Sequence, residues 1–350
     1  MMQLPHEIHT EDELEEALAI PCPELADMMR RLDGDILVLG VAGKMGPSLA
    51  RLAFNACRQA GVRKRIIGVS RFSDQAQRDA LDRFGVETLS CDLLNQADVE
   101  RLPKVNNVIF MAGRKFGLVG SEALTWATNA VVPTNVARAF KQSRIVAFST
   151  GCVYPLVSAE TGGSVETDPV GPVGDYAISC VERERVFQQC SQENGTPVLL
   201  FRLNYAIDLR YGVLVDIAQN VYAQQPVDSS VEWVNVIWQG DANSRALLCL
   251  EHTGCPAAVL NVTGPELLSV RVQAEEFGRV FQKEVTYTGV RSGVAYLSNA
   301  ARSVALFGPP RVSIPQLRKW VAAWIAHGGR LLGKPTHFQV TDGQFLTKPA

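Results

Sequence analysis

The sequence predicts an α/β protein: a doubly wound parallel sheet of the Rossmann type with a smaller C-terminal substrate-binding part. Two observations predict this fold class. Short β-branched runs alternate with longer helical patterns over the first two hundred residues, and such alternation is typical of a parallel sheet covered by helices on both faces. In addition, the first of these runs leads directly into a glycine-rich turn at residues 40–46 and then into a helical pattern.

The expected strands are short runs rich in Val, Ile and Leu, at residues 36–39, 66–69, 86–89, 108–111, 145–148 and 198–201. The expected helices between them lie at residues 47–60, 74–84, 122–141 and 176–194. Beyond residue 205 the pattern loosens, with helices expected at 213–224, 243–252, 270–281 and 314–326 and a strand-like run at 231–238.

This pattern suggests a division of the chain. Residues 1–33 hold an acidic helix-prone stretch and a Pro-Cys-Pro break, and we expect an N-terminal extension, for which docking to a partner is one hypothesis. Residues 34–205 are expected to form the dinucleotide-binding domain, to which 231–263 return. Residues 206–230 and 264–350 then supply the substrate-binding part.

The composition excludes several classes of function. The chain has 350 residues, 47% hydrophobic and 20% charged, with a net charge of −2, so neither nucleic-acid nor membrane binding is indicated. No run approaches the roughly 20 apolar residues that span a bilayer. Eight scattered cysteines without a C-x-x-C pair indicate reduced thiols. We therefore expect a cytoplasmic protein.

One group of side chains, Cys249, His252 and Cys255, has a spacing that a zinc site would allow. However, Cys249 falls within an apolar run at 246–250, and buried cysteine is common packing material. We therefore predict no metal site.

The glycine turn is expected to bind a dinucleotide. Gly40, Gly43 and Gly46 have the spacing G-x-x-G-x-x-G between a strand and a helix, where the backbone turns tightly and helix N–H groups meet a pyrophosphate. Lys44 and Met45 lie within the same turn and are expected to contact the cofactor. A glycine-rich turn without a ligand is the alternative.

The end of the second expected strand bears on the choice between NAD and NADP. An acidic residue there would bond the ribose 2′-hydroxyl of NAD, but the sequence has Ser70 and Arg71. An arginine fork suits a 2′-phosphate, so we expect NADP to be preferred and NAD to be possible. After the third strand, Asp92 and Leu93 are expected beside the adenine, although Asp92 fits a helix cap nearly as well.

Several motifs together resemble the extended short-chain dehydrogenase/reductase family, the NAD-dependent epimerases, dehydratases and reductases of sugars. They are the glycine loop, Thr-Gly-Cys-Val-Tyr-Pro at 150–155 and Tyr-Ala-Ile-Ser at 176–179, with Asn-Ala-Val-Val-Pro-Thr-Asn at 129–135, Arg-Leu-Asn-Tyr at 202–205 and an N-x-x-G-P stretch at 261–265. The resemblance covers residues 35 to 326.

The resemblance implies a set of roles. Tyr176 would be the general acid/base, Thr150 would orient the substrate hydroxyl and Asn129 would support a proton relay, while Ala112 and Gly113 would line the cofactor site. In the family a lysine four residues after the tyrosine holds the nicotinamide ribose and lowers the tyrosine pKa. This sequence has Cys180 there.

A neutral thiol cannot supply the missing charge, and three interpretations follow. Another cation replaces the lysine, with Arg183, Arg114 and Lys115 as candidates; or the chemistry differs; or the protein binds NADP(H) without turnover as a redox sensor or regulator. The first is favoured because Thr150 and Tyr176 are both present.

Cys152 resembles the cysteine that exchanges protons in the GDP-fucose synthase branch. That branch needs a histidine after R-x-x-N, and this chain has none between His9 and His252, so a small pocket-lining residue is equally consistent.

For the substrate, the run 231–238 lacks the basic residue that nucleotide-sugar members bring to a diphosphate. We expect contacts from Asn204, Arg210, Tyr211 and Trp233, although paired tryptophans on a strand are more often core.

The predicted function is hydride transfer between NADP(H) or NAD(H) and a secondary alcohol carbon of a sugar-like molecule, with net oxidation, net reduction and epimerisation all open. The expected partner is a small molecule, and the family implies a homodimer formed through helices 122–141 and 176–194.

Overall fold

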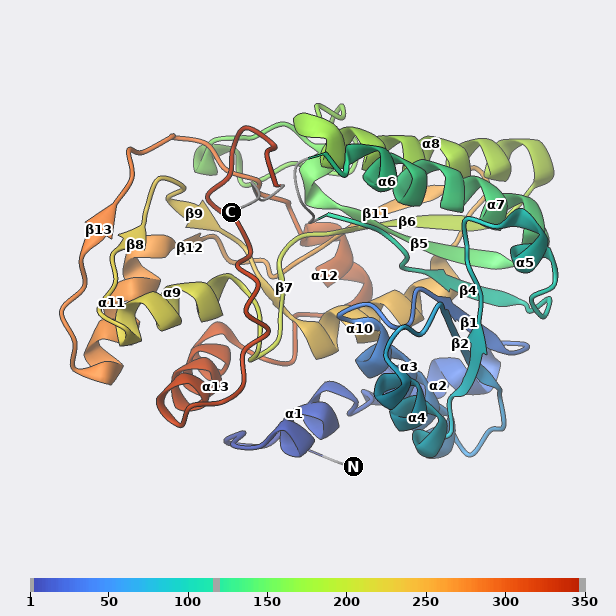
Figure 1. Cartoon of the computed structure of the whole chain (residues 1–350), viewed down its shortest axis with the longest axis horizontal. Coiled ribbons are helices and arrows are strands. Elements are labelled where there is room, and N and C mark those ends of the chain that lie inside the picture. The colour runs from blue at the N-terminus through green and yellow to red at the C-terminus, as the bar shows by residue number, and fades with distance from the viewer. Residues whose placement is uncertain (1–2, 116–119, 346–350) are drawn as a thin grey trace.

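The structure is a computed structural model that describes residues 3–115 and 120–345. Its centre is a seven-stranded parallel sheet in the order β11-β6-β5-β4-β1-β2-β3, which confirms the predicted fold class (Figure 1). The strands are β1 (Ile36–Leu39), β2 (Ile66–Ser70), β3 (Glu87–Ser90), β4 (Asn107–Phe110), β5 (Arg144–Thr150), β6 (Val198–Leu203) and β11 (Ala258–Val262).

All six expected strands are confirmed in place, within two residues at each end. The central ones are buried on both faces, as the four buried residues of β1 show, which is why they are continuous apolar runs. The seventh strand, β11, was not predicted. It extends the sheet beyond β6 by pairing Ala258 with Leu199.

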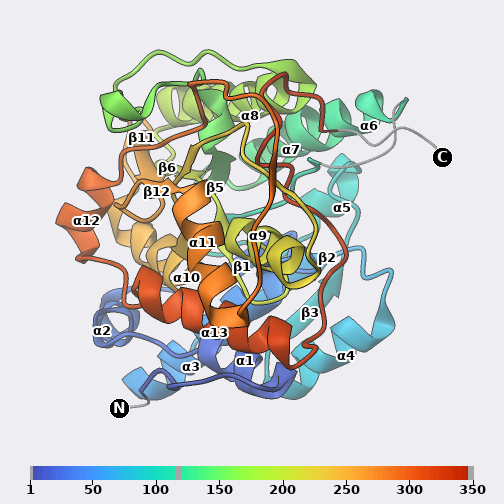
Figure 2. The same cartoon turned by 90° about the vertical axis from the view of Figure 1, so that its left-hand side faces the viewer.

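Helices cover both faces of the sheet (Figures 1 and 2). One core lies under α2 (Pro23–Arg31), α3 (Gly46–Ala60) and α10 (Gln239–Leu248). The other lies under α5 (Gln96–Glu100), α7 (Val132–Ala139) and α8 (Gly174–Asn194). At the β3 edge, α4 (Gln75–Phe84) begins with an Asp74 cap and ends at Gly85, which has the positive φ that suits a helix C-terminus.

The expected helix 122–141 is divided into three parts. It consists of α6 (Glu122–Trp126), a π-helical turn (Ala127–Val131) and α7. Such turns are rare and occur frequently at functional sites, and this one contains Asn129.

A second lobe packs around α9 (Val213–Tyr222), α11 (Val270–Phe281) and α13 (Ile314–Ala326). Three two-stranded sheets complete it: β7 (Ala206–Ile207) with β10 (Ile237–Trp238), β8 (Val227–Asp228) with β13 (Tyr287–Thr288), and β9 (Trp233–Val234) with β12 (Leu268–Ser269). The expected single strand 231–238 is therefore wrong, because β9 and β10 pair in different sheets. Helix α12 (Ala301–Phe307) follows near β11.

The N-terminal segment packs on the body of the protein. Helix α1 (Glu11–Leu18) begins with a capping box between Thr10 and Glu13, and it buries Leu14 and Leu18 in the core of the second lobe. Helix α2 packs on α3 in the Rossmann part. Residues 8–32 thus connect the two lobes.

Among residues 3–115 and 120–345, none of the helices combines the length and apolar character that crossing a bilayer requires.

Candidate functional site

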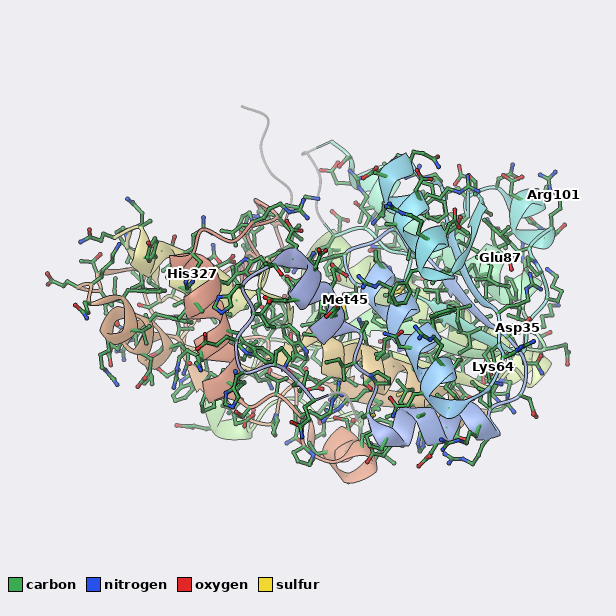
Figure 3. All side chains as sticks on the ribbon, turned by 90° about the horizontal axis from the view of Figure 1, so that it is seen from below. Asp35, Met45, Lys64, Glu87, Arg101 and His327 are labelled. Carbon is green, nitrogen blue, oxygen red and sulfur yellow. The ribbon has the colours of Figure 1, made fainter. Side chains whose placement is uncertain are left out.

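The glycine loop follows the carboxyl end of β1, the edge of a parallel sheet where ligands bind. Viewed from below, Met45 lies near the middle of the molecule, toward the second lobe that carries His327, whereas Asp35 and Glu87 mark the opposite end of the strands (Figure 3). The loop is held in place by hydrogen bonds from the N–H groups of Gly40 and Val41 to the Val69 carbonyl, at 2.9 and 3.1 Å.

A cavity of about 340 Å³ opens beside this loop. Its lining includes eight of the residues predicted for the cofactor: Gly40, Gly43, Ser70, Arg71, Asp92, Leu93, Ala112 and Gly113. These residues follow β1, β2, β3 and β4 in turn, so the sheet order brings them together. Lys44, Met45 and Gly46 are not part of this lining; Met45 and Gly46 are buried behind it.

The local geometry fits a dinucleotide. A Cβ on Gly40 would lie 2.7 Å from the Ala112 nitrogen, and one on Gly46 would lie 2.1 Å from the Val41 carbonyl oxygen. Both positions therefore require glycine, and the backbone faces the cavity at Gly40 and Gly43 without side chains. Arg114, which also lines the cavity, has a buried Nε atom without a partner among the described residues.

Asp92 lines the cavity, and the alternative of a helix cap is wrong, because Asn95 caps α5. Its Oδ1 accepts a hydrogen bond from the Leu94 N–H at 3.1 Å, as in a local turn. Arg71 is exposed at the rim of the cavity and forms no ion pair among the described residues, so its guanidinium is available to a ligand.

The residues predicted to be catalytic come from three elements. Thr150 ends β5, Tyr176 lies in the first turn of α8, and Asn129 lies in the π-helical turn. Thr150 lowers the pKa of Tyr176, so the two side chains lie close together. The fold therefore assembles residues that are up to 47 positions apart in the sequence.

Asn129 is buried, and both the nitrogen and the oxygen of its side-chain amide form hydrogen bonds. Its Nδ2 donates to the Arg114 carbonyl and to Ser179 Oγ, each at 2.9 Å. Its Oδ1 accepts from the Arg114 N–H at 2.9 Å and from Arg183 Nη2 at 2.6 Å. The π-helical turn thus joins the segment after β4 to helix α8.

Arg183 is the cation that the structure places at the centre of this site. It is 5% exposed, and its Nη1 donates to the Phe148 carbonyl at 2.9 Å. A Cβ on Gly113 would lie 2.7 Å from Arg183 Nη2. The guanidinium therefore lies directly behind the cofactor cavity, one helical turn beyond Cys180.

Burial and the charge of Arg183 have opposite effects on the pKa of Tyr176. Burial is the largest cause that raises its pKa well above the usual value, the neighbouring Cys180 and Cys152 raise the pKa further, and Arg183 lowers it. Burial also raises the pKa of the Cys180 thiol, which Arg183 again opposes. In the free protein Tyr176 is therefore protonated near neutral pH.

Two lysine ammonium groups lie over tyrosine rings. The Lys115 ammonium lies 5.5 Å from the centre of the Tyr176 ring, and burial lowers the pKa of Lys115. The Lys44 ammonium lies 3.5 Å above the Tyr211 ring. Lys44 is exposed as a residue, but desolvation of its ammonium over that ring lowers its pKa to about 7.

The chain matches the model of the NAD dependent epimerase/dehydratase family over residues 36–207. This stretch contains the glycine loop, Asn129, Thr150, Tyr176 and Arg202. The match covers just under half of the chain. The family depends on NAD, and this cofactor fits the cavity described above.

Solved structures of the family share the fold at low sequence identity. UDP-glucose 4-epimerase of Thermotoga maritima, in a complex with UDP-glucose, is 17% identical with a TM-score of 0.66, covering 84% of this chain and 99% of that chain. DesIV of Streptomyces venezuelae, a dTDP-glucose 4,6-dehydratase, is 17% identical with a TM-score of 0.70, covering 83% and 97%. WbmG of Bordetella bronchiseptica, bound to NAD and UDP, is 20% identical with a TM-score of 0.68, covering 84% and 96%. No curated protein matches the sequence significantly.

The residues predicted for the substrate lie in different surroundings. Asn204 is buried and donates to Asn235 Oδ1 at 2.8 Å and to the Tyr296 carbonyl at 3.0 Å. The Lys44 ammonium lies over the ring of Tyr211. Trp233 is 38% exposed on β9 and does not line the cofactor cavity.

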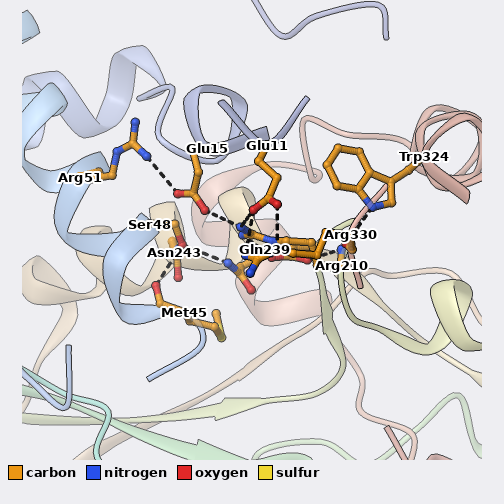
Figure 4. Close-up of polar contacts among 11 residues, drawn as sticks. Glu11, Glu15, Met45, Ser48, Arg51, Arg210, Gln239, Asn243, Trp324 and Arg330 are labelled. Atoms are coloured by element: carbon orange, nitrogen blue, oxygen red, sulfur yellow. Dashed lines mark hydrogen bonds and ion pairs between the residues drawn. The ribbon is translucent and has the colours of Figure 1, made fainter. Parts of the chain in front are cut away.

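Arg210 is held by acidic residues. Its guanidinium pairs with Asp208 at 2.8 Å and with Glu15 of α1 at 2.7 Å. Glu15 also pairs with Arg51 of α3 at 3.0 Å, so one carboxylate joins the two lobes (Figure 4). This arrangement directs Arg210 toward the N-terminal helix.

The candidate site also contains residues that the sequence did not reveal. Tyr296 and Phe345 are buried in one apolar cluster with Cys152 and Ala177. Ser298 Oγ lies 2.9 Å from the position of a Cβ on Gly151. They come from segments without a recognisable motif, so no signal in the sequence pointed to them.

Proposed function

We propose that the protein catalyses hydride transfer at a secondary alcohol carbon of a sugar or sugar derivative, with Tyr176 as the acid/base and Arg183 in place of the family's lysine. The observation that carries this proposal is the buried guanidinium of Arg183, which lies against Gly113 of the cofactor cavity and lowers the Tyr176 pKa. It supplies the positive charge that a Cys180 thiol lacks.

The proposed step is balanced by two transfers from the same alcohol group. In the direction of oxidation, the hydroxyl proton passes to the ionised oxygen of Tyr176, and the hydride leaves the carbon with its two electrons. A nicotinamide cofactor, when bound, would supply the acceptor for this hydride. Thr150, at the end of β5, holds the reacting hydroxyl.

The substrate class is supported by the family and by the ligands of similar structures, which include UDP-glucose and UDP. The first compounds to test are therefore nucleotide sugars, followed by free aldoses and uronates. The assay follows nicotinamide absorbance with NAD and with NADP, and the products of redox-neutral conversion are separated by chromatography.

Two variants test the proposed roles on whichever compound turns over. Tyr176→Phe should abolish turnover while cofactor affinity stays close to wild type, and wild-type turnover in Tyr176→Phe would overturn the assignment. Ile178→Ala, an exposed position two residues further along α8, is the matched control and should remain active.

A redox sensor that binds the cofactor without turnover is the second candidate, and the observation favouring it is the buried Cys180 beside Tyr176. Turnover by the wild-type protein discriminates the two functions, and Cys180→Lys tests whether the missing lysine limits activity. If Arg183 already replaces the lysine, this change gains no activity and costs stability, because it buries a second cation. A sensor instead shows tight cofactor binding, no turnover, and no response to Cys180→Lys.

We also propose that the protein is a homodimer through α6–α7 and α8. Val131 and Ile178 are 48% and 40% exposed on these helices, which suits an apolar interface. Light scattering of Val131→Asp and Ile178→Asp tests this proposal. Monomers in the variants and a dimer in the wild type are expected, whereas a monomeric wild type would contradict the proposal.

A further inference from the structure

Residues 331–345, which we call the strap, leave the second lobe after α13 and run between the two lobes (Figure 1). The strap is anchored at Thr336, whose backbone N–H and hydroxyl both donate to Asp216 Oδ2, at 2.8 and 2.6 Å. Just beyond the anchor, Phe338 is buried in the core of the second lobe. The first half of the strap is therefore attached to the substrate side.

The other end of the strap is packed on the start of α8. A Cβ on Gly343 would lie 2.3 Å from the Val173 carbonyl oxygen, and one on Gly174 would lie 2.6 Å from the Gly343 oxygen. The two backbones thus touch immediately before Tyr176. This contact brings the strap across the carboxyl edge of the sheet.

Phe345 covers the acid/base residue. Its ring lies edge-on to the Tyr176 ring, with centroids 5.7 Å apart and planes at 84°, and it is 4% exposed among Cys152, Ala177 and Tyr296. The Lys115 ammonium lies 4.2 Å from the centre of the Phe345 ring. The hydrocarbon ring of Phe345 therefore fills the space beside Tyr176 and Cys152.

Two hydroxyls at this place find no hydrogen-bond partner among the described residues. They belong to Tyr296, which is 3% exposed, and to Ser298, which borders Gly151. Buried hydroxyls are nearly always paired, and the Phe345 ring has no donor or acceptor to offer. With Phe345 in this position, the hydroxyls of Tyr296 and Ser298 lack the hydrogen-bond partner that a ligand oxygen would provide.

We propose that the strap is a displaceable cover of the active site, and that a polyhydroxylated substrate takes the place of Phe345 and pairs with the hydroxyls of Tyr296 and Ser298. This inference deepens the proposed function, on which it rests for the identity of the reacting site. The competing arrangement is a fixed wall, in which Phe345 never leaves its position.

Thiol labelling tests the cover without any need for turnover. The full-length protein carries Cys255→Ser, which removes the exposed cysteine, and is saturated with NAD. The rate at which N-ethylmaleimide labels Cys152 is measured by mass spectrometry of its peptide. Cys249, buried in the Rossmann core, reports global unfolding in the same sample.

Two variants separate a moving cover from a fixed wall. Phe345→Ala opens the space directly, and we expect Cys152 to react about tenfold faster in it. Thr336→Val removes one anchoring hydrogen bond without touching the Cys152 cluster, and we expect at least threefold faster labelling because the strap opens more often. Thr253→Val, which loses a hydroxyl bonded to the Leu250 carbonyl, is the matched control and should leave the rate unchanged.

A Cys152 rate unaffected by Thr336→Val and raised only by Phe345→Ala would establish a fixed wall and overturn the proposal. Rates unchanged in both variants would overturn it as well. These outcomes are independent of the proposed function, because a protein without turnover gives the same labelling result.

The proposed hydrogen bond between the Tyr296 hydroxyl and the substrate is tested on the compound found to turn over. Tyr296→Phe removes a buried hydroxyl without a partner, so the thermal midpoint should stay equal or rise, while KM rises about tenfold. A lower midpoint with unchanged KM would instead assign Tyr296 a structural role and contradict the proposed contact.

Discussion

Arg183 Nη2 lies 2.6 Å from Asn129 Oδ1 and so connects α8 to the π-helical turn. The same guanidinium donates to the Phe148 carbonyl of β5. One cation therefore links α8, β5 and the π-helical turn, which lines the cofactor cavity through Thr128, and it is the proposed substitute for the lysine replaced by Cys180.

Replacing Arg183 should change both turnover and its pH profile. Because Arg183 lowers the Tyr176 pKa, Arg183→Met raises that pKa, and the rise of the oxidation rate with pH moves to higher pH. We expect kcat/KM to fall by about 100-fold or more. Arg183→Lys keeps the charge and should recover part of the loss, whereas equal profiles in all three proteins would assign Arg183 a packing role.

Arg71 should decide between the two cofactors. It lies at the rim of the cavity after β2, where a fork of donors suits a 2′-phosphate. In Arg71→Ala, NADPH affinity should fall about tenfold, equivalent to about 1.4 kcal/mol, while NADH affinity stays nearly constant. Fluorescence titration with both cofactors measures this. A wild-type protein that binds NADH far more tightly than NADPH would contradict the expected preference.

Lys44 should make cofactor binding depend on pH. Its pKa of about 7 is set by desolvation over Tyr211, with Asp208 and Asp216 raising the pKa and Lys115 and Arg210 lowering it. The ammonium is charged below this pH and neutral above it, so its attraction for a pyrophosphate weakens as pH rises. We expect the Kd for NAD to increase several-fold from pH 6 to pH 8.5. Lys44→Met should flatten this dependence, and identical slopes in both proteins would exclude Lys44 as the cause.

Glu15 should contribute to stability through the ion pairs that join the lobes. Because Glu15, Arg51 and Arg210 are largely shielded from solvent, we expect Glu15→Gln to lower the free energy of unfolding by about 1 kcal/mol, less so in 1 M salt. Urea denaturation measures the loss. Arg101→Gln, which removes an ion pair at a highly exposed side chain, is the control and should cost less than about 0.5 kcal/mol.

The buried pair of Glu184 and Arg202 should be the most sensitive ionic contact. Its atoms are 2.7 Å apart, and Ser149 Oγ also donates to Glu184 at 2.6 Å. Glu184→Gln leaves the buried guanidinium of Arg202 without its countercharge, so unfolding should become easier by about 3–5 kcal/mol. Glu193→Gln, at an exposed position of the same helix, should change stability by less than about 0.5 kcal/mol. Equal effects would show that the pair is solvated.

The Rossmann part of this protein could be predicted from local patterns in the amino-acid sequence. The continuous apolar run of β1 is a local signal that predicts a strand. Gly40, at a position of a tight turn that requires glycine, is a local signal that predicts the turn. The strand β11 is not predicted because Asn261 interrupts its short apolar run. The run 231–238 does not form one strand because Asn235, bonded to Asn204, interrupts it.

The residues that surround Tyr176 could not be predicted from local patterns and are known from the folded chain. The sequence offered Arg183, Arg114 and Lys115 as candidates for the cation that replaces the lysine. The packing of α8 against the π-helical turn buries the Arg183 guanidinium against Asn129. It also directed Arg210 to Glu15, which lies 195 positions away, and laid Phe345 over the site. Local patterns cannot report these contacts, because each depends on where distant segments meet in space.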